Sequence, residues 1–193
     1  MKIVARSAIL ALSLVTFACG DDDDKKDGQT IDEIPEQLAG TYTSPCLPNT
    51  VLSLSHSTRE LRFSKLGDFD KKEVYYSDNC ASAPALVYKV SGTAQHKGSS
   101  PDNPELDLIN FSVKNAYITI GTQATVDALN ALSFCGKKDW ALDVETSVAD
   151  ANCSGFTIKK GEVIEDVYDD RDGTLFFGKK FALLLSGDGE RPT

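Results

Sequence analysis

The sequence has few of the residues that usually carry catalysis or bind metals. Its 193 residues include two histidines, one methionine and one tryptophan. Neither His56 nor His96 has a neighbour in the sequence that would make it a catalytic base, and the common motifs of hydrolases, zinc proteases and nucleotide-binding loops are missing. We therefore predict that the protein is not an enzyme and has no cofactor and no metal site.

Positive charge is also scarce. The chain has 20 Lys and Arg against 29 Asp and Glu, which gives a formal net charge of −9. Binding to the phosphates of nucleic acid needs a basic surface, which this composition does not supply. We expect no nucleic-acid partner.

Long apolar runs are missing as well. Lys2 and Arg6 precede an apolar stretch of eleven residues, 8–18. A membrane-spanning helix needs about 20 such residues. A basic start, a short apolar stretch and a small residue before a cysteine are typical of a secretory signal peptide, so we assign residues 1–18 to one.

Residues 16–19, Thr-Phe-Ala-Cys, resemble a bacterial lipobox and predict acylation of Cys19 after cleavage. An ordinary signal-peptidase cut after Ala18 is the alternative. Two or three acyl chains anchor a protein stably on a membrane surface. The expected location is the bacterial cell envelope, as an outer-membrane lipoprotein whose partner is the membrane.

Acidic residues dominate the segment that follows. Residues 20–36 hold eight acids and two lysines. So little apolar surface cannot offset the entropy lost on ordering. We predict that residues 19–36 carry the lipid and form a disordered tether, and that residues 37–193 form one domain.

The other four cysteines are Cys46, Cys80, Cys135 and Cys153. An even number in an exported protein predicts two disulfides, for which three pairings are possible. Cys46 and Cys80 each follow the end of a predicted strand, whereas Cys135 and Cys153 bracket the segment around Trp140. We therefore predict the bonds Cys46–Cys80 and Cys135–Cys153.

Short segments with alternating apolar residues dominate the predicted domain, and this pattern is typical of half-buried strands. Residues 97–104 and 172–173 read as a loop and a hairpin turn. One segment, 123–133, has helical spacing, with Thr122 or Thr125 as N-cap and Gly136 beyond its end. We predict an antiparallel barrel of about eight or nine short strands and one helix. The candidate segments from which these strands are drawn are 40–43 or 40–44, 60–63, 74–76, 86–91, 106–113, 116–120, 140–144, 156–159, 163–168 and 174–177.

Aromatic residues on these segments are candidates for a core or a ligand pocket. An eight-stranded barrel has an interior wide enough for one small ligand. The candidates are Tyr42, Phe63, Tyr76, Tyr88, Phe111, Tyr117, Trp140 and Phe176.

Several short motifs in this order resemble a family. Gly40-Thr41-Tyr42 is similar to the Gly-x-Trp opening of lipocalins and other calycins, with Tyr in place of Trp. The whole series resembles a group of bacterial secreted proteins and lipoproteins, themselves distantly similar to the lipid-binding ectodomain of the adenomatosis polyposis coli down-regulated Wnt antagonist. The motifs lie at 40–42, 46, 75–80, 135–140, 173–178 and 191–193.

The resemblance implies a lipocalin-like β-barrel with a pocket for a hydrophobic ligand. Our leading hypothesis is a membrane-anchored lipoprotein whose barrel binds a small hydrophobic or lipid-like ligand non-covalently. The alternative is a structural or protein-interaction lipoprotein with a solid core. Residues 97–104 and those around Trp140 would then form the contacts, because binding residues concentrate on loops.

Overall fold

The computed structural model describes residues 34–178 except 50, 154–155 and 172–173. The predicted signal peptide, Cys19, most of the tether and the predicted turn at 172–173 lie outside the described residues. The helical elements are η1 (Glu36–Leu38), η2 (Val51–Ser53), α1 (Gln123–Ala131) and η3 (Phe134–Gly136). The strands are β1 (Gly40–Thr43), β2 (Leu47–Pro48), β3 (His56–Phe63), β4 (Asp68–Tyr76), β5 (Leu86–Ser99), β6 (Asp107–Ile120), β7 (Thr146–Ser147), β8 (Asn152–Cys153), β9 (Phe156–Thr157), β10 (Val163–Arg171) and β11 (Thr174–Phe177).

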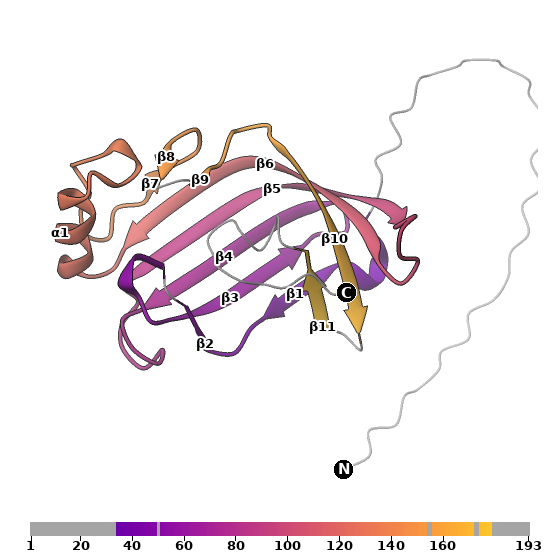
Figure 1. Cartoon of the computed structure of the whole chain (residues 1–193), viewed down its shortest axis with the longest axis horizontal. Helices are drawn as coiled ribbons and strands as arrows, with labels where there is room; N and C mark the ends of the chain where they lie inside the picture. Colours follow the sequence, from indigo (N-terminus) through magenta and orange to yellow (C-terminus); the bar gives the residue numbers. More distant parts are fainter. Residues whose placement is uncertain (1–33, 50, 154–155, 172–173, 179–193) are drawn as a thin grey trace, which may run out of the picture. The chain divides into compact units, whose positions relative to one another are not determined.

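Antiparallel strands form a nearly closed, barrel-shaped sheet, which confirms the predicted fold class (Figure 1). Within the described residues this sheet has nine strands, in the order β1-β3-β4-β5-β6-β10-β11, with β2 paired to β3 and β7 paired to β6. Strands β8 and β9 form a separate pair. Neighbours in sequence are mostly neighbours in the sheet, so short hairpin connections build most of the barrel.

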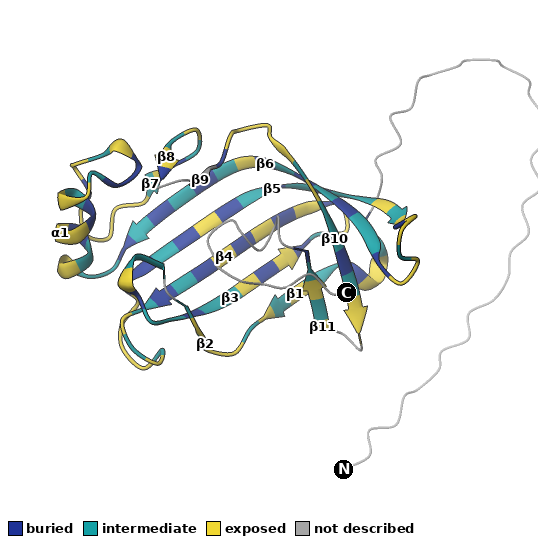
Figure 2. Ribbon diagram, in the orientation of Figure 1, coloured by how far each residue is buried: buried dark blue, intermediate teal, exposed yellow. Residues whose placement is uncertain are grey.

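Burial alternates along the long strands, as expected for a sheet with one face inside (Figure 2). The inner face of β6 is apolar and includes Val113, Ala116, Ile118 and Ile120, all at most 1% exposed. The two segments predicted at 106–113 and 116–120 are one strand, β6. A register shift opposite Ser91 and Gly92 lets this strand continue without a break.

Helix α1 is two residues shorter than the predicted 123–133. Thr122 is its N-cap and accepts a hydrogen bond from the Thr125 backbone amide at 3.4 Å. At the other end, Ser133 adopts a left-handed conformation with φ of 50°. This conformation cannot continue an α-helix, which explains the earlier end.

The strand predicted at 140–144 is wrong, because Trp140 is held by the helical region instead. The Asn130 side chain accepts from the Trp140 amide at 2.8 Å and donates to its carbonyl at 3.0 Å. The indole Nε1 donates to the Phe134 carbonyl at 3.1 Å. In this segment, Leu142 alone makes an isolated bridge to Ile120 among the described residues.

Two further boundaries differ from the prediction. The ordered domain includes Ile34 and η1, ahead of the predicted start at 37, because Ile34 is 3% exposed and Leu38 1% exposed within the hydrophobic core. Strand β5 extends through Ser99, so residues 97–99 of the predicted loop 97–104 are strand. Its last register pair joins Ser99 to Asp107 of β6.

Both predicted disulfides, Cys46–Cys80 and Cys135–Cys153, are confirmed. The first ties the segment after β1 to the segment after β4, and the second ties η3 to β8. Structural disulfides persist in oxidising compartments and are rare in the cytosol. The two bonds therefore indicate an oxidising, exported environment.

Candidate functional site

The inner faces of β3, β4 and β5 carry polar side chains where a barrel interior is usually apolar. Strand pairing places Arg59, Glu73 and Tyr88 in one interior row that continues to Ile118 on β6. We call the polar residues of this row, together with the polar residues of the adjacent interior rows, the interior polar cluster. It consists of Ser57, Arg59, Lys71, Glu73, Tyr75 and Tyr88.

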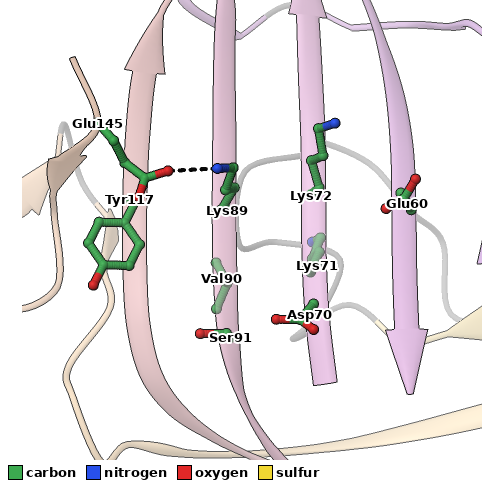
Figure 3. A pocket seen from close by; sticks show the side chains of 9 residues that line it. All are labelled: Glu60, Asp70, Lys71, Lys72, Lys89, Val90, Ser91, Tyr117 and Glu145. Carbon is green, nitrogen blue, oxygen red and sulfur yellow. Dashed lines mark hydrogen bonds and ion pairs between the residues drawn. The ribbon is translucent and has the colours of Figure 1, made fainter. Parts of the chain in front are cut away.

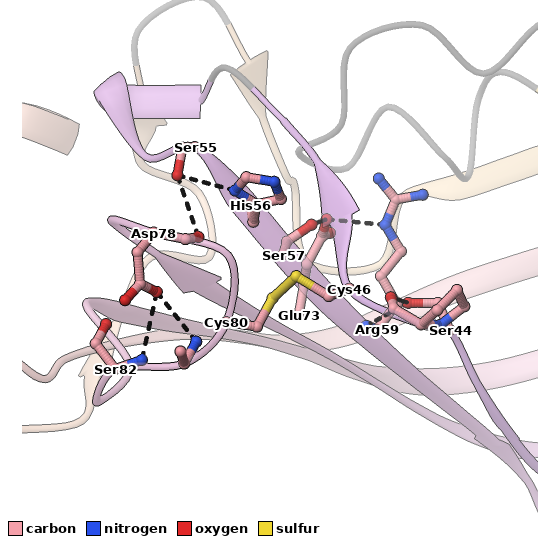
Figure 4. Close-up of a disulfide and its surroundings, with 12 residues drawn as sticks. Ser44, Cys46, Ser55, His56, Ser57, Arg59, Glu73, Asp78, Cys80 and Ser82 are labelled. Atoms are coloured by element: carbon pink, nitrogen blue, oxygen red, sulfur yellow. Dashed lines mark hydrogen bonds and ion pairs between the residues drawn. A yellow bond between two sulfur atoms is a disulfide. The ribbon is translucent and has the colours of Figure 1, made fainter.

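Glu73 is the centre of the cluster. Its side chain is 0% exposed, and its Oε1 accepts from Arg59 Nε at 2.9 Å and from Ser57 Oγ at 3.3 Å (Figure 4). The Arg59 side chain is 33% exposed, so it bridges the buried carboxylate and the solvent. A buried carboxylate is costly unless it is paired, and Arg59 supplies that pair.

The two tyrosines of the cluster stay neutral. Burial, and then the negative charge of Glu73, raise the pKa of Tyr75 and the pKa of Tyr88 well above their ordinary value. Both rings are fully buried. Their hydroxyl groups therefore serve as hydrogen-bonding groups at any physiological pH.

Two buried polar atoms of the cluster have no hydrogen-bond partner among the described residues. They are Glu73 Oε2 and the Tyr88 hydroxyl. An unsatisfied buried polar group costs about 1–3 kcal/mol, so native proteins keep few of them. The two residues that carry these atoms lie opposite each other in the pairing of β4 and β5.

An aromatic cluster lies next to the polar one. Phe63 and Phe69 form the interior row beyond Leu61 and Lys71. The ring of Phe111 lies 5.2 Å from Phe69 and 6.0 Å from Phe177. The interior thus has a polar part on β3–β5 and an apolar part made by β6 and these rings.

The outer face of the same strands carries a different kind of site. A depression of about 280 Å³ lies across β3, β4, β5 and β6, where Lys89 Nζ pairs with Glu145 Oε2 at 2.6 Å (Figure 3). Its lining mixes acidic and basic residues, so charge of neither sign dominates. The lining residues are Glu60, Asp70, Lys72, Lys89, Ser91, Tyr117 and Glu145, which are exposed or half-buried, together with Lys71 and Val90, which are buried residues of the inner face.

The structure brings only some of the predicted aromatic residues together. Phe63, Tyr88 and Phe111 are buried in the barrel, and Tyr42 is half-buried with its ring 6.5 Å from that of Phe63. Trp140 is buried but packs on Phe134 near α1.

Three other candidates do not face the interior. Tyr76 and Tyr117 are half-buried on the outer face, and Phe176 is 43% exposed, with the Arg171 guanidinium 5.6 Å from its ring centre. The residues that face the interior on these strands are their sequence neighbours, such as Tyr75 next to Tyr76 and Phe177 next to Phe176. The sequence analysis did not name these neighbours as candidates. The interior residues that were missed are Ser57, Arg59, Phe69, Lys71, Glu73, Tyr75 and Phe177.

The two histidines lie outside the interior polar cluster. His56 Nδ1 is 3.0 Å from Ser55 Oγ, and His96 Nε2 is 3.5 Å from Asp107 Oδ1. Within the part of the chain that the structure describes, no three His, Cys, Asp or Glu side chains gather as a metal-binding group. None of the helices described is both long and apolar enough to cross a membrane.

Lys71 gives the cluster a pH dependence. Burial lowers the pKa of Lys71 from 10.5 to about 8, although Glu73 opposes this shift. Between those pH values the unfolded chain binds a proton that the folded chain has lost, so the free energy of unfolding rises with pH. Relative to Lys71→Met, which lacks this titration, we expect the wild type to gain about 3 kcal/mol across this range.

Urea unfolding of both proteins between pH 8 and 10.5, the span of the two pKa values of Lys71, measures this gain. Both proteins share the other titrating groups, so their difference isolates Lys71. Parallel curves for the two proteins would contradict the lowered pKa.

No known family model matches the chain. A search of curated proteins also finds no match.

Proposed function

We propose that the protein is a membrane-anchored lipoprotein, acylated at Cys19, whose barrel binds a small hydrophobic or lipid-like ligand non-covalently. The observation that carries the proposal is the pair of unpartnered buried polar atoms, Glu73 Oε2 and the Tyr88 hydroxyl, beside an apolar wall. Ligand sites are mostly apolar surfaces with a few polar groups that orient the ligand. The resemblance to lipid-binding lipocalin-like barrels supports the same proposal.

Binding of the neutral fluorescent probe N-phenyl-1-naphthylamine to the purified protein tests the proposal. We expect saturable binding of one probe per chain. Ala116→Phe adds a ring to the apolar wall of the interior, where Ala116 is 0% exposed, and should weaken the binding at least tenfold.

The matched control is Thr119→Phe, which adds the same ring to the half-buried outer face of the same strand and should leave probe binding unchanged. Circular dichroism establishes that both variants are folded. Absence of saturable binding to the wild type, or equal loss in the two variants, would contradict an interior site.

The anchor has its own test. We expect mass spectrometry of the membrane-extracted protein to show an N-terminal cysteine carrying acyl chains, because residues 16–19 resemble a lipobox. Cys19→Ser should move the protein to the soluble fraction. An unmodified chain that begins at Cys19 in the soluble fraction of wild-type cells would contradict the proposal.

A protein-interaction role is the second candidate. Leu132, Leu142 and Val144, at 67%, 43% and 50% exposed, are three large apolar side chains in or directly after the helical region. Exposed apolar surface of this kind is typical of contact sites. This role requires a solid core, so saturable probe binding that Ala116→Phe abolishes would argue against it.

A further inference from the structure

We propose that the depression on the outer face of β3–β6 binds a small zwitterionic solute of the amino-acid type, which carries a carboxylate and an ammonium group. This site is separate from the proposed interior site and does not depend on it. Two charges of its lining, Glu60 and Lys72, have no ion partner among the described residues, and the sheet places them side by side.

The other exposed charges that line the depression are already paired. Lys89 Nζ pairs with Glu145 Oε2 at 2.6 Å, and Asp70 pairs at 3.3 Å with the arginine opposite it on β3. By contrast, Glu60 and Lys72 make no ion pair and no side-chain hydrogen bond within the described part of the chain (Figure 3). The depression therefore offers one acid and one base to a ligand.

Strand pairing fixes the order of these charges. Glu60 of β3 is the register partner of Lys72 of β4, and Lys72 is the register partner of Lys89 of β5. Neighbouring strands lie about 4.8 Å apart, so an acid and two bases follow one another at that spacing. Like charges directly opposite each other are destabilising. A ligand carboxylate that accepts from both lysines would relieve this repulsion, because each ammonium group has three donors.

A ligand with a single charge fits this row less well. An anion at Lys72 would lie beside the unpaired carboxylate of Glu60, and a cation at Glu60 would lie beside the unpaired ammonium group of Lys72. Like charges at such distances repel, although water and salt screen them on an exposed face. A zwitterion avoids both penalties, because its carboxylate faces Lys72 while its ammonium group faces Glu60.

The size of the depression favours a small ligand. Its volume of about 280 Å³ is near the lower end of ligand sites, which range from about 300 to 1,000 Å³. Glu60 and Lys72 are both exposed, so the contacts are screened by solvent. We expect weak binding, with a Kd on the order of 1 mM.

Three ligands with the same chain length test the proposal: γ-aminobutyrate, butyrate and butylammonium. Each is titrated at pH 7 into the purified, isotope-labelled protein, and NMR follows the backbone amide shifts of β3, β4 and β5. We expect saturable shifts around Lys72 with γ-aminobutyrate and at least fivefold weaker binding of the two singly charged ligands. Added salt should weaken the binding of γ-aminobutyrate, because both contacts are ionic.

Variants that remove one charge assign the contacts. Lys72→Gln should weaken γ-aminobutyrate at least fivefold. Glu60→Gln should weaken γ-aminobutyrate by a similar factor, but butyrate should bind at least as tightly as before, because the carboxylate beside the anion is gone. Lys114→Gln removes an exposed lysine of β6 that lies outside the depression, and as the matched control it should change neither affinity. All three positions are exposed, so the variants should fold.

Two results would overturn the proposal. If γ-aminobutyrate shifts no amide of β3–β5, Glu60 and Lys72 satisfy each other and the depression is not a site. If butyrate binds as tightly as γ-aminobutyrate, Glu60 plays no part and the ligand is not a zwitterion. Ala116→Phe separates this site from the interior one: it should leave γ-aminobutyrate binding unchanged, and a loss of binding in that variant would place the ligand inside the barrel and contradict an outer site.

Discussion

Gly92→Ala is expected to lower the free energy of unfolding by about 3 kcal/mol or more, at the upper end of overpacking effects. A Cβ atom at this position would lie 2.0 Å from the Ser112 carbonyl oxygen and 2.9 Å from Phe69 Cε1. The first contact is with the backbone of the paired strand, which cannot move without opening the bulge between β5 and β6. The methyl group therefore disrupts the sheet at its longest strand pair.

Gly40→Ala is the matched control. Its Cβ would meet nothing closer than the Tyr42 ring at 3.8 Å, which is ordinary van der Waals contact. This variant should change stability by less than about 1 kcal/mol. Urea unfolding of both variants measures the difference, and a Gly92→Ala protein as stable as Gly40→Ala would contradict the bulge geometry.

Glu73→Ala is expected to destabilise the protein by about 3–5 kcal/mol, because breaking a buried ion pair leaves its partners uncompensated. Arg59 Nε and Ser57 Oγ would lose their acceptor, and buried Lys71 would lose its nearby negative charge. Denaturant unfolding at pH 7 measures the loss. It also reports whether the carboxylate has a structural role besides the proposed contact with a ligand.

Glu60→Ala is the control for this measurement, since Glu60 is exposed and lies one residue from Arg59 on the same strand. Removing an exposed carboxylate should cost less than about 1 kcal/mol. The double variant Lys71→Met/Glu73→Met should be more stable than Glu73→Ala, because it removes two buried charges of opposite sign together. Equal losses for Glu73→Ala and Glu60→Ala would contradict the buried pair.

Local signals predicted the helix and the disulfide pairing well. The helical spacing after Thr122 and the glycine at 136 bracket α1 to within two residues of its observed end. The cysteine pairing followed from the placement of strand ends, which sequence patterns show directly. In both cases the information lies within a short stretch of chain.

The interior polar cluster could not be predicted in the same way. On β4, the alternation of Val74 and Tyr76 suggested that their face is buried, but that face is the outer one. The buried face instead carries Lys71, Glu73 and Tyr75. Charged residues are rarely buried without partners, and the partner Arg59 becomes a neighbour only when β3 pairs with β4.

The strand predicted at 140–144 was wrong for a related reason. Its residues have a β-prone pattern, but the Asn130 side chain forms hydrogen bonds with both the amide and the carbonyl of Trp140. Asn130 lies ten residues earlier in the sequence. A bond of this kind is a tertiary contact that competes with strand pairing. No pattern within the segment itself indicates it.

A crystal structure of the protein grown with N-phenyl-1-naphthylamine tests the interior site most directly. We expect electron density for the probe inside the barrel, against the apolar wall formed by Ala116 and Ile118. An interior filled by protein side chains, with no probe inside, would contradict the account.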